Sequence, residues 1–187
     1  SEVWGFVQNN REFAVIGSTI GAHIIDVQNS SLPFVAAEIP AAVQGYPANH
    51  RDYHDYDGYL YAVGDQNDVV QNTNCTFQII DIRDLPFSTN VVHNSDSLFQ
   101  RSHNIFIDTA TAKLYVCAPF HADGSSSGLE VYDLTDPESP VLLGDFPPST
   151  YIHDVYVRND TAFCHDPFEN ILYVVDFSDA ANPNILG

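Results

Sequence analysis

Short apolar segments that end in aspartate recur four times along the chain. They occupy residues 23–26, 78–81, 130–133 and 173–176, and a proline follows each aspartate by five or seven residues. Their short length, their β-branched and aromatic residues and the Gly, Pro, Asn and Asp clusters around them predict β-strands. No apolar stripe of helical period and ten or more residues competes with this interpretation.

A second predicted strand precedes each of these segments, and a first strand precedes the second. The second strands cover residues 13–16, 60–63, 114–117 and 161–164, and the first strands begin near Glu2, Asp52, Asn104 and Asp154. Taking these four residues as equivalent gives repeat periods of 50, 52 and 50 residues. A fourth strand follows the proline, as in residues 141–143 and 185–186.

Four short strands in each repeat of roughly 50 residues are typical of a β-propeller blade. The sequence therefore predicts an all-β chain that forms a single propeller segment. Its four blades lie at about residues 1–49, 50–100, 101–151 and 152–187. We expect it to be part of a larger propeller, because end blades without neighbours expose apolar faces, here around Trp4 and Ile185. Further chain or another subunit is expected to complete the ring.

Charge narrows the range of partners. The chain has 25 acidic residues against 6 basic ones, a formal net charge of −19. Nucleic acids and anionic membranes bind through clustered Lys and Arg, so neither is expected as a partner, whereas cations are compatible. A purely solubilising role of the acidic surface stays open. No apolar run approaches the roughly 18 residues of a membrane helix, so direct membrane insertion is not expected.

Cysteine and asparagine patterns bear on the cellular compartment. Three cysteines without a CxxC pair argue against a zinc knuckle or a thioredoxin-like motif and leave open one disulfide with one buried thiol. They are Cys75, Cys117 and Cys164. The N-glycosylation pattern occurs at Asn29, Asn74 and Asn159, although chance matches are frequent in an Asn-rich chain. These features favour an extracellular or cell-surface protein.

Several motifs carry a family resemblance. The chain opens with Glu-Val-Trp-Gly-Phe at residues 2–6, has Ser-His-Asn-Ile at 102–105 and Ile-His-Asp-Val at 152–155, and carries Asp-Leu-Thr-Asp-Pro at 133–137. With the Ile-Ile-Asp and Val-Val-Asp strand ends, these motifs resemble the LVIVD-repeat propellers of the choice-of-anchor B family over essentially all 187 residues. The resemblance implies a secreted or surface-displayed propeller of more than four blades, without an established general activity. Glu2 departs from the pattern, in which Asp is usual.

The strongest candidate site is the set of equivalent first-strand residues, because the innermost strands of a propeller line its central channel. These residues are Glu2, Arg51, Asp52, His103, Asn104, His153 and Asp154. They can ligate a divalent cation such as calcium, with His103, His153 and Asp154 as the metal candidates, or bind a small polar ligand. Alternatively, they hold neighbouring blades together through buried hydrogen bonds.

Other acidic residues have simpler explanations. Asp55, Asp57, Asp65 and Asp68 offer oxygen ligands suited to calcium, but their spacing does not fit an EF-hand, and solvated turns account for them. The aspartate that ends each third strand is expected to accept backbone N–H groups of the following turn.

Two functions follow from these observations. The first is a structural, adhesive or partner-binding role, with a protein or glycan partner bound by blade-edge loops. The alternative is a divalent-cation-dependent hydrolase or lactonase, with its site in the central channel and a carboxylate, His103 or His153 as base. GxGxxG and P-loop motifs are absent from the sequence. The Gly-Ser-Ser-Ser-Gly stretch at residues 124–128 is interpreted as a flexible loop between strands because no helix is predicted after it, so no nucleophile is named.

Overall fold

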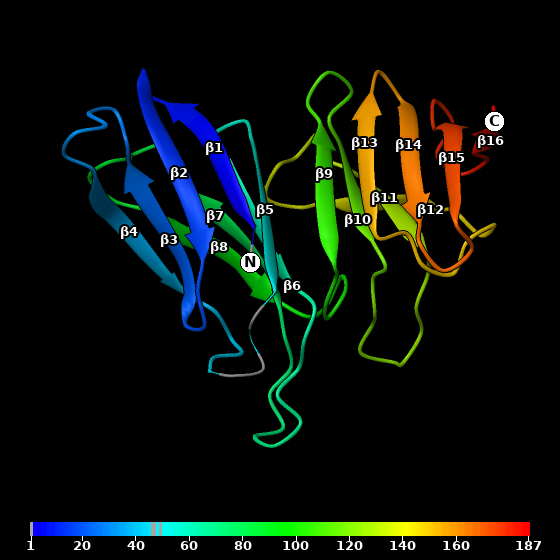
Figure 1. Ribbon diagram of the computed structural model, residues 1–187, viewed down its shortest axis with the longest axis horizontal. Coiled ribbons are helices and arrows are strands. Elements are labelled where there is room, and N and C mark those ends of the chain that lie inside the picture. Colours follow the sequence, from blue (N-terminus) through cyan, green and yellow to red (C-terminus); the bar gives the residue numbers. More distant parts are fainter. Residues whose placement is uncertain (1, 46–47, 49) are drawn as a thin grey trace. The chain divides into compact units, whose positions relative to one another are not determined.

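The protein is built from antiparallel β-strands (Figure 1). This computed structural model describes residues 2–45, 48 and 50–187, and these residues contain four four-stranded sheets and no helix. Within each sheet the strands follow one another in chain order. The predicted all-β architecture with a repeated four-stranded unit is confirmed. None of the described segments is a helix that could cross a membrane.

The strand bounds agree with the repeat pattern of the sequence. Sheet 1 consists of β1 (Val3–Gln8), β2 (Arg11–Gly17), β3 (Gly21–Asp26) and β4 (Phe34–Pro40). Sheet 2 consists of β5 (Arg51–Tyr56), β6 (Tyr59–Gly64), β7 (Phe77–Asp81) and β8 (Asn90–Ser95). Sheet 3 consists of β9 (Asn104–Asp108), β10 (Lys113–Cys117), β11 (Leu129–Asp133) and β12 (Val141–Asp145). Sheet 4 consists of β13 (Asp154–Arg158), β14 (Thr161–Asp166), β15 (Ile171–Asp176) and β16 (Asn184–Ile185).

The aspartate at the end of each third strand closes the following turn. In each of the four sheets its Oδ1 atom accepts the backbone N–H two residues later, at 2.8 to 3.1 Å. These aspartates are Asp26, Asp81, Asp133 and Asp176. Hydrogen bonds from the residue two positions later lower the pKa of the last three. The structural role predicted for these carboxylates is confirmed.

A β-bulge recurs beside this aspartate. The pairing of the third and fourth strands shifts register between Ile24 and Ile25 in sheet 1, between Ile79 and Ile80 in sheet 2, and at the equivalent position in sheet 3. A bulge increases the local twist and bends the strand. The extra residue lies in the fourth strand, which therefore bends at the same place in three successive repeats.

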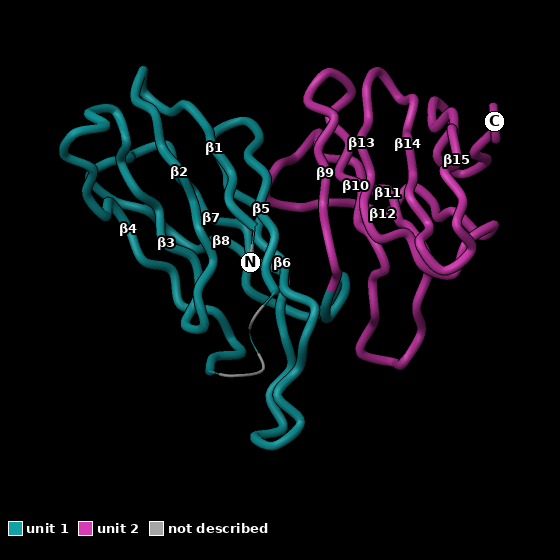
Figure 2. Tube along the Cα trace, in the orientation of Figure 1, with its two compact units in different colours: residues 1–101 teal, residues 102–187 magenta. Residues whose placement is uncertain are grey.

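The chain divides into two compact units (Figure 2), which are described separately. Unit 1 covers residues 1–101 and holds sheets 1 and 2; unit 2 covers residues 102–187 and holds sheets 3 and 4. In unit 1, strand β1 runs beside β5. The core between its two sheets contains Phe13, Val15 and Ile24 from sheet 1 and Leu60 and Ile80 from sheet 2. One apolar face of each sheet is thereby removed from water.

Unit 2 repeats this arrangement. Strand β9 runs beside β13, and the core between the sheets includes Leu129 and Val131 from sheet 3 and Val155 and Val175 from sheet 4. Strand β12 of sheet 3 also approaches closely the turn between β15 and β16 of sheet 4. A Cβ atom added at Gly144 of β12 would lie 2.1 Å from the carbonyl oxygen of Ala180, so glycine alone permits this approach.

The outward faces of sheets 1 and 4 are partly apolar. Val3, Val7 and Ile16 are exposed on sheet 1, and Tyr156, Phe163 and Leu172 are exposed on sheet 4. Ile185 is also exposed, as predicted. The apolar face expected around Trp4 is exposed at the neighbouring Val3. The Trp4 ring itself packs against the core of unit 1, and its Nε1 donates a hydrogen bond to Asp55 at 2.7 Å.

All three cysteines are free and buried. A disulfide, which the sequence left open, is therefore not formed. Burial raises the pKa of the Cys75 thiol, and it raises the pKa of Cys164 to about 12. Each thiol accordingly behaves as a small apolar core side chain.

Candidate functional site

The equivalent first-strand residues lie in two different environments. Arg51 and Asp52 of β5 are buried, with 5% and 4% of their surface exposed. Arg51 donates from Nε to the carbonyl oxygen of Ser18 at 3.1 Å and from Nη2 to that of Val43 at 2.7 Å. The guanidinium thus ties the first strand of sheet 2 to segments that flank sheet 1. In unit 1 these positions hold the structure together.

Unit 2 places a pair of histidines at the same repeat position. His103 and His153 immediately precede β9 and β13, and their Nε2 atoms are 3.0 Å apart. Their ring centroids are 4.3 Å apart. His153 is exposed and His103 is half-buried. The fold thus brings these two predicted candidates together within one unit, and their binding of a ligand stays a prediction.

The neighbours of this histidine pair affect its protonation. The rings of Tyr151 and His165 lie 6.4 and 6.3 Å from the ring of His153. Burial, and then the charges of His103 and His165, lower the pKa of His153, against an opposing effect of Asp154. His153 is consequently neutral at pH 7 and keeps a lone pair on one ring nitrogen.

The remaining first-strand candidates have local roles. Glu2 is exposed, and its backbone N–H donates to the carbonyl oxygen of Arg51 at 3.0 Å. Asp154 is exposed and accepts the N–H of Val155 at 2.8 Å. The carbonyl oxygen of Asn104 accepts a hydrogen bond from Ser102 Oγ at 2.9 Å. Our expectation of a buried His153 or Asp154 that joins two blades is wrong as to burial, because both residues are exposed.

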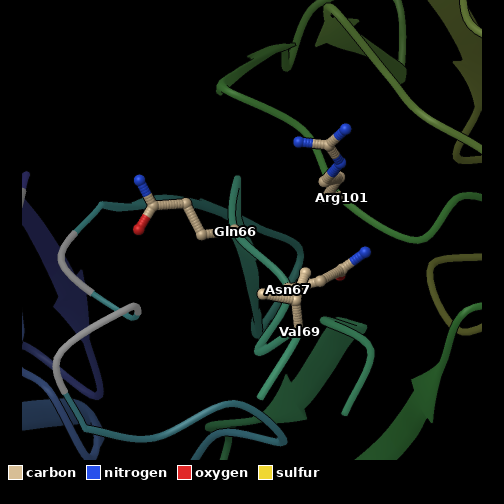
Figure 3. A pocket seen from close by; sticks show the side chains of 4 residues that line it. All are labelled: Gln66, Asn67, Val69 and Arg101. Atoms are coloured by element: carbon tan, nitrogen blue, oxygen red, sulfur yellow. The ribbon is translucent and has the colours of Figure 1, made fainter. Parts of the chain in front are cut away.

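A cavity of about 300 Å³ adjoins the loop between β6 and β7 in unit 1. Figure 3 shows its lining residues, Gln66, Asn67, Val69 and Arg101. Asn67 is held by hydrogen bonds to Gln100 and to the N–H of Cys75, and Arg101 Nη1 donates to the carbonyl oxygen of Asp65 at 3.3 Å. The cavity is a recess beside this loop.

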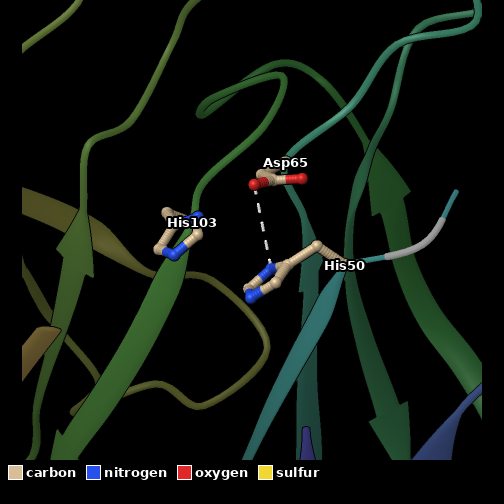
Figure 4. A group of neighbouring side chains, drawn as sticks. All are labelled: His50, Asp65 and His103. Carbon is tan, nitrogen blue, oxygen red and sulfur yellow. Dashed lines mark ion pairs between the residues drawn. The ribbon is translucent and has the colours of Figure 1, made fainter. Parts of the chain in front are cut away.

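The acidic residues considered for calcium serve separate purposes. Asp55 accepts the Trp4 hydrogen bond, Asp68 accepts the N–H groups of two residues in its own loop, and Asp57 lies in a turn with a positive φ of 48°. Asp65 forms an ion pair with His50 at 3.8 Å (Figure 4). The expectation of solvated turns therefore holds for Asp57, which is exposed, and is wrong for Asp68, which is buried.

A hydrogen-bonded chain of three side chains in sheet 1 was missed by the sequence analysis. Ser18 Oγ lies 2.7 Å from His23 Nε2, and His23 Nδ1 lies 3.1 Å from Glu38 Oε1. His23 and Glu38 also border a cavity of about 160 Å³. The order of atoms is that of a nucleophile, a base and an acid that orients the base. The three residues come from separate strands and loops, so no short motif marks them.

Two of the three other repeats favour a structural role for this chain. The position of His23 is occupied by Gln78 in sheet 2 and by Tyr173 in sheet 4. Gln78 Nε2 donates to the carbonyl oxygen of Pro40 in sheet 1, and the Tyr173 ring packs 5.3 Å from that of Phe146, which follows sheet 3. At Gln78 and Tyr173 this position therefore contacts the neighbouring sheet or the residue that follows it, which indicates a role in packing between sheets rather than in catalysis.

The three glycosylation candidates are accessible. Asn29, Asn74 and Asn159 are all exposed, and Asn159 lies in the turn between β13 and β14 with a positive φ of 50°. Their modification stays a prediction.

Comparison with known proteins adds no family assignment. No protein-family model matches this chain, and no curated protein matches its sequence. Function is therefore argued from the geometry described above.

Proposed function

We propose that the four sheets are consecutive blades of an LVIVD-type β-propeller of the choice-of-anchor B kind, secreted or displayed on the cell surface, with a structural and partner-binding role. One observation carries this proposal. In each unit the first strands of two successive sheets run side by side while the sheets bury a common core. Propeller blades pack in this way around their axis.

The exposed faces of sheets 1 and 4 support the same proposal. Tyr156 is paired with Phe163, and Val3 with Ile16, so each face carries apolar side chains on neighbouring strands. A repeat sheet that exposes such a face gains stability when another repeat covers it. Further blades, from more chain or from a second copy, are the proposed cover.

Sedimentation over a range of concentrations tests this proposal. The parent chain is expected to associate, and Phe163→Glu is expected to shift it towards the monomer because a carboxylate then lies in the buried face. Phe87→Glu is the matched control, since Phe87 is 92% exposed and lies outside the strands. A parent chain that is a monodisperse monomer at every concentration contradicts the proposal.

The partner is proposed to be a protein rather than a glycan. Val69 and Val70, at the tip of the loop between β6 and β7, are 88% and 90% exposed. Asp68 holds this loop through hydrogen bonds to the N–H groups of Val70 and Gln71. Two aliphatic side chains on an ordered loop suit an apolar protein surface better than a sugar.

Hydrolysis with a divalent cation is a second candidate, and the His103–His153 pair is the observation that favours it. An ion held by two imidazoles keeps positions open for water and can lower the pKa of that water. The test is hydrolysis of a chromogenic lactone in the presence of added metal. Activity that His153→Gln abolishes supports this candidate, and metal-independent or absent activity contradicts it.

A further inference from the structure

We infer that His103 and His153 form a two-nitrogen site for a divalent transition-metal ion of the Cu²⁺ or Ni²⁺ type. Both residues belong to unit 2, so this inference does not depend on the proposed propeller. It also replaces calcium, since calcium takes oxygen ligands and imidazole suits Cu, Ni and Zn.

The distance between the two nitrogens fits one ion. The Nε2 atoms are 3.0 Å apart. An ion about 2.0 to 2.1 Å from each nitrogen, a usual metal–imidazole distance, then subtends a nitrogen–metal–nitrogen angle of roughly 90 to 100°. This angle belongs to adjacent positions of a square or tetragonal site, which Cu²⁺ and Ni²⁺ prefer. Tetrahedral Zn²⁺ requires the two nitrogens to move apart by a few tenths of an ångström, roughly.

The backbone fixes both ligands before an ion arrives. His103 donates its N–H to the carbonyl oxygen of Cys117 at 3.0 Å, and His153 donates to that of His165 at 2.9 Å. Both acceptors lie in second strands that pair with β9 and β13. The ligands therefore start from rigid strands that run side by side, which reduces the ordering needed for binding.

The protonation state also suits metal binding. When two Nε2 atoms are hydrogen-bonded, one of them carries the hydrogen and the other accepts it. Both can bind an ion once the hydrogen of the donor ring has moved to its Nδ1 atom. The carboxylate of Asp154, next in sequence, and the net charge of −19 attract a cation to this surface.

Titration of the metal-free full chain with Cu²⁺ tests the inference. We expect one ion whose electron paramagnetic resonance spectrum shows coupling to two nitrogens, and we expect His103→Gln and His153→Gln each to lose it. His121→Gln is the matched control: His121 bonds Glu130 at 2.8 Å, and glutamine can replace that hydrogen bond. Acidification is expected to release the ion as both imidazoles become protonated.

Several results contradict the inference. These are the absence of a bound ion in the parent chain, coupling to fewer than two nitrogens, and equal binding by the parent, His103→Gln and His153→Gln. The nitrogen coupling is measured on the parent itself, so it remains decisive even if a variant folds poorly. Ni²⁺ titrated in the same way is expected to give the same dependence on both histidines.

Discussion

Lys113, the one lysine of the chain, joins the two sheets of unit 2. Its Nζ atom lies 2.8 Å from Asp160 Oδ1 in the turn between β13 and β14, and 2.8 Å from the carbonyl oxygen of Phe177 after β15. Asp108 completes the contact by accepting the N–H of Asp160 at 3.0 Å. Lys113→Met retains most of the side-chain stem but removes both charged hydrogen bonds. The substitution therefore probes the junction between sheets 3 and 4.

The expected loss follows from how far this pair is buried. Its side chains are 14% and 21% exposed. Exposed ion pairs contribute about 0 to 1 kcal/mol, whereas breaking a buried pair costs about 3 to 5 kcal/mol. The Lys113–Asp160 pair is partly buried and Lys113 makes a second hydrogen bond, so Lys113→Met is expected to lower the free energy of unfolding by about 2 to 3 kcal/mol. For a chain of this size the melting temperature should fall by about 4 to 12 °C.

Urea unfolding followed by far-ultraviolet circular dichroism measures this loss. Arg158→Met is the matched control, because Arg158 is an exposed cation on the neighbouring strand β13. Asp160→Asn alone and combined with Lys113→Met completes a double-mutant cycle, with an expected coupling energy of about 0.5 to 3 kcal/mol. A loss for Lys113→Met no larger than that of Arg158→Met refutes this account of the junction.

Four further predictions concern single groups. A thiol reagent should modify no cysteine in the native protein and three after denaturation, since all three are buried; rapid native labelling contradicts this. Because its pKa is lowered, Asp133 stabilises the fold above its ordinary pKa and loses that effect on acidification, so Asp133→Asn should flatten the fall of unfolding free energy below about pH 4. The pKa of His153 is also lowered, so as pH falls through about 6.5 the unfolded state binds this proton before the folded state does, and the fold loses stability. His153→Gln should therefore reduce the drop in melting temperature between pH 7.5 and 5.5. A fluorophosphonate probe should not label Ser18. An adduct that forms on the parent protein but not on Ser18→Ala would falsify the structural interpretation of this residue.

The strands could be predicted from the sequence because their signals are local. Apolar runs, turn residues and the terminal aspartate all lie within a few residues of one another, and each aspartate bonds to the N–H two positions later. The recurrent bulge could not be predicted in the same way. It depends on how the third strand pairs with the fourth, and the intervening turn does not mark the extra residue.

The candidate site was predicted in part for a similar reason. The repeat period selected Arg51, His103 and His153 as equivalent, but their burial depends on contacts between distant segments. Arg51 is covered because Ser18 and Val43 offer carbonyl oxygens to its guanidinium. No local sequence motif around Arg51 identifies these acceptors. In the same way, no motif around Lys113 identifies Asp160 as its partner.

Repetition explains why the histidine pair exists in unit 2. Adjacent first strands bring residues one period apart face to face, so a side chain at this position meets its counterpart from the next repeat. His103 and His153 are separated by 50 positions, and both repeats carry histidine there. Where a repeat carries arginine, as at Arg51, the side chain instead donates hydrogen bonds to carbonyl oxygens and is buried. The repeated turn and bulge thus build the sheets, whereas the chemistry of the first-strand position depends on which residues two successive repeats supply.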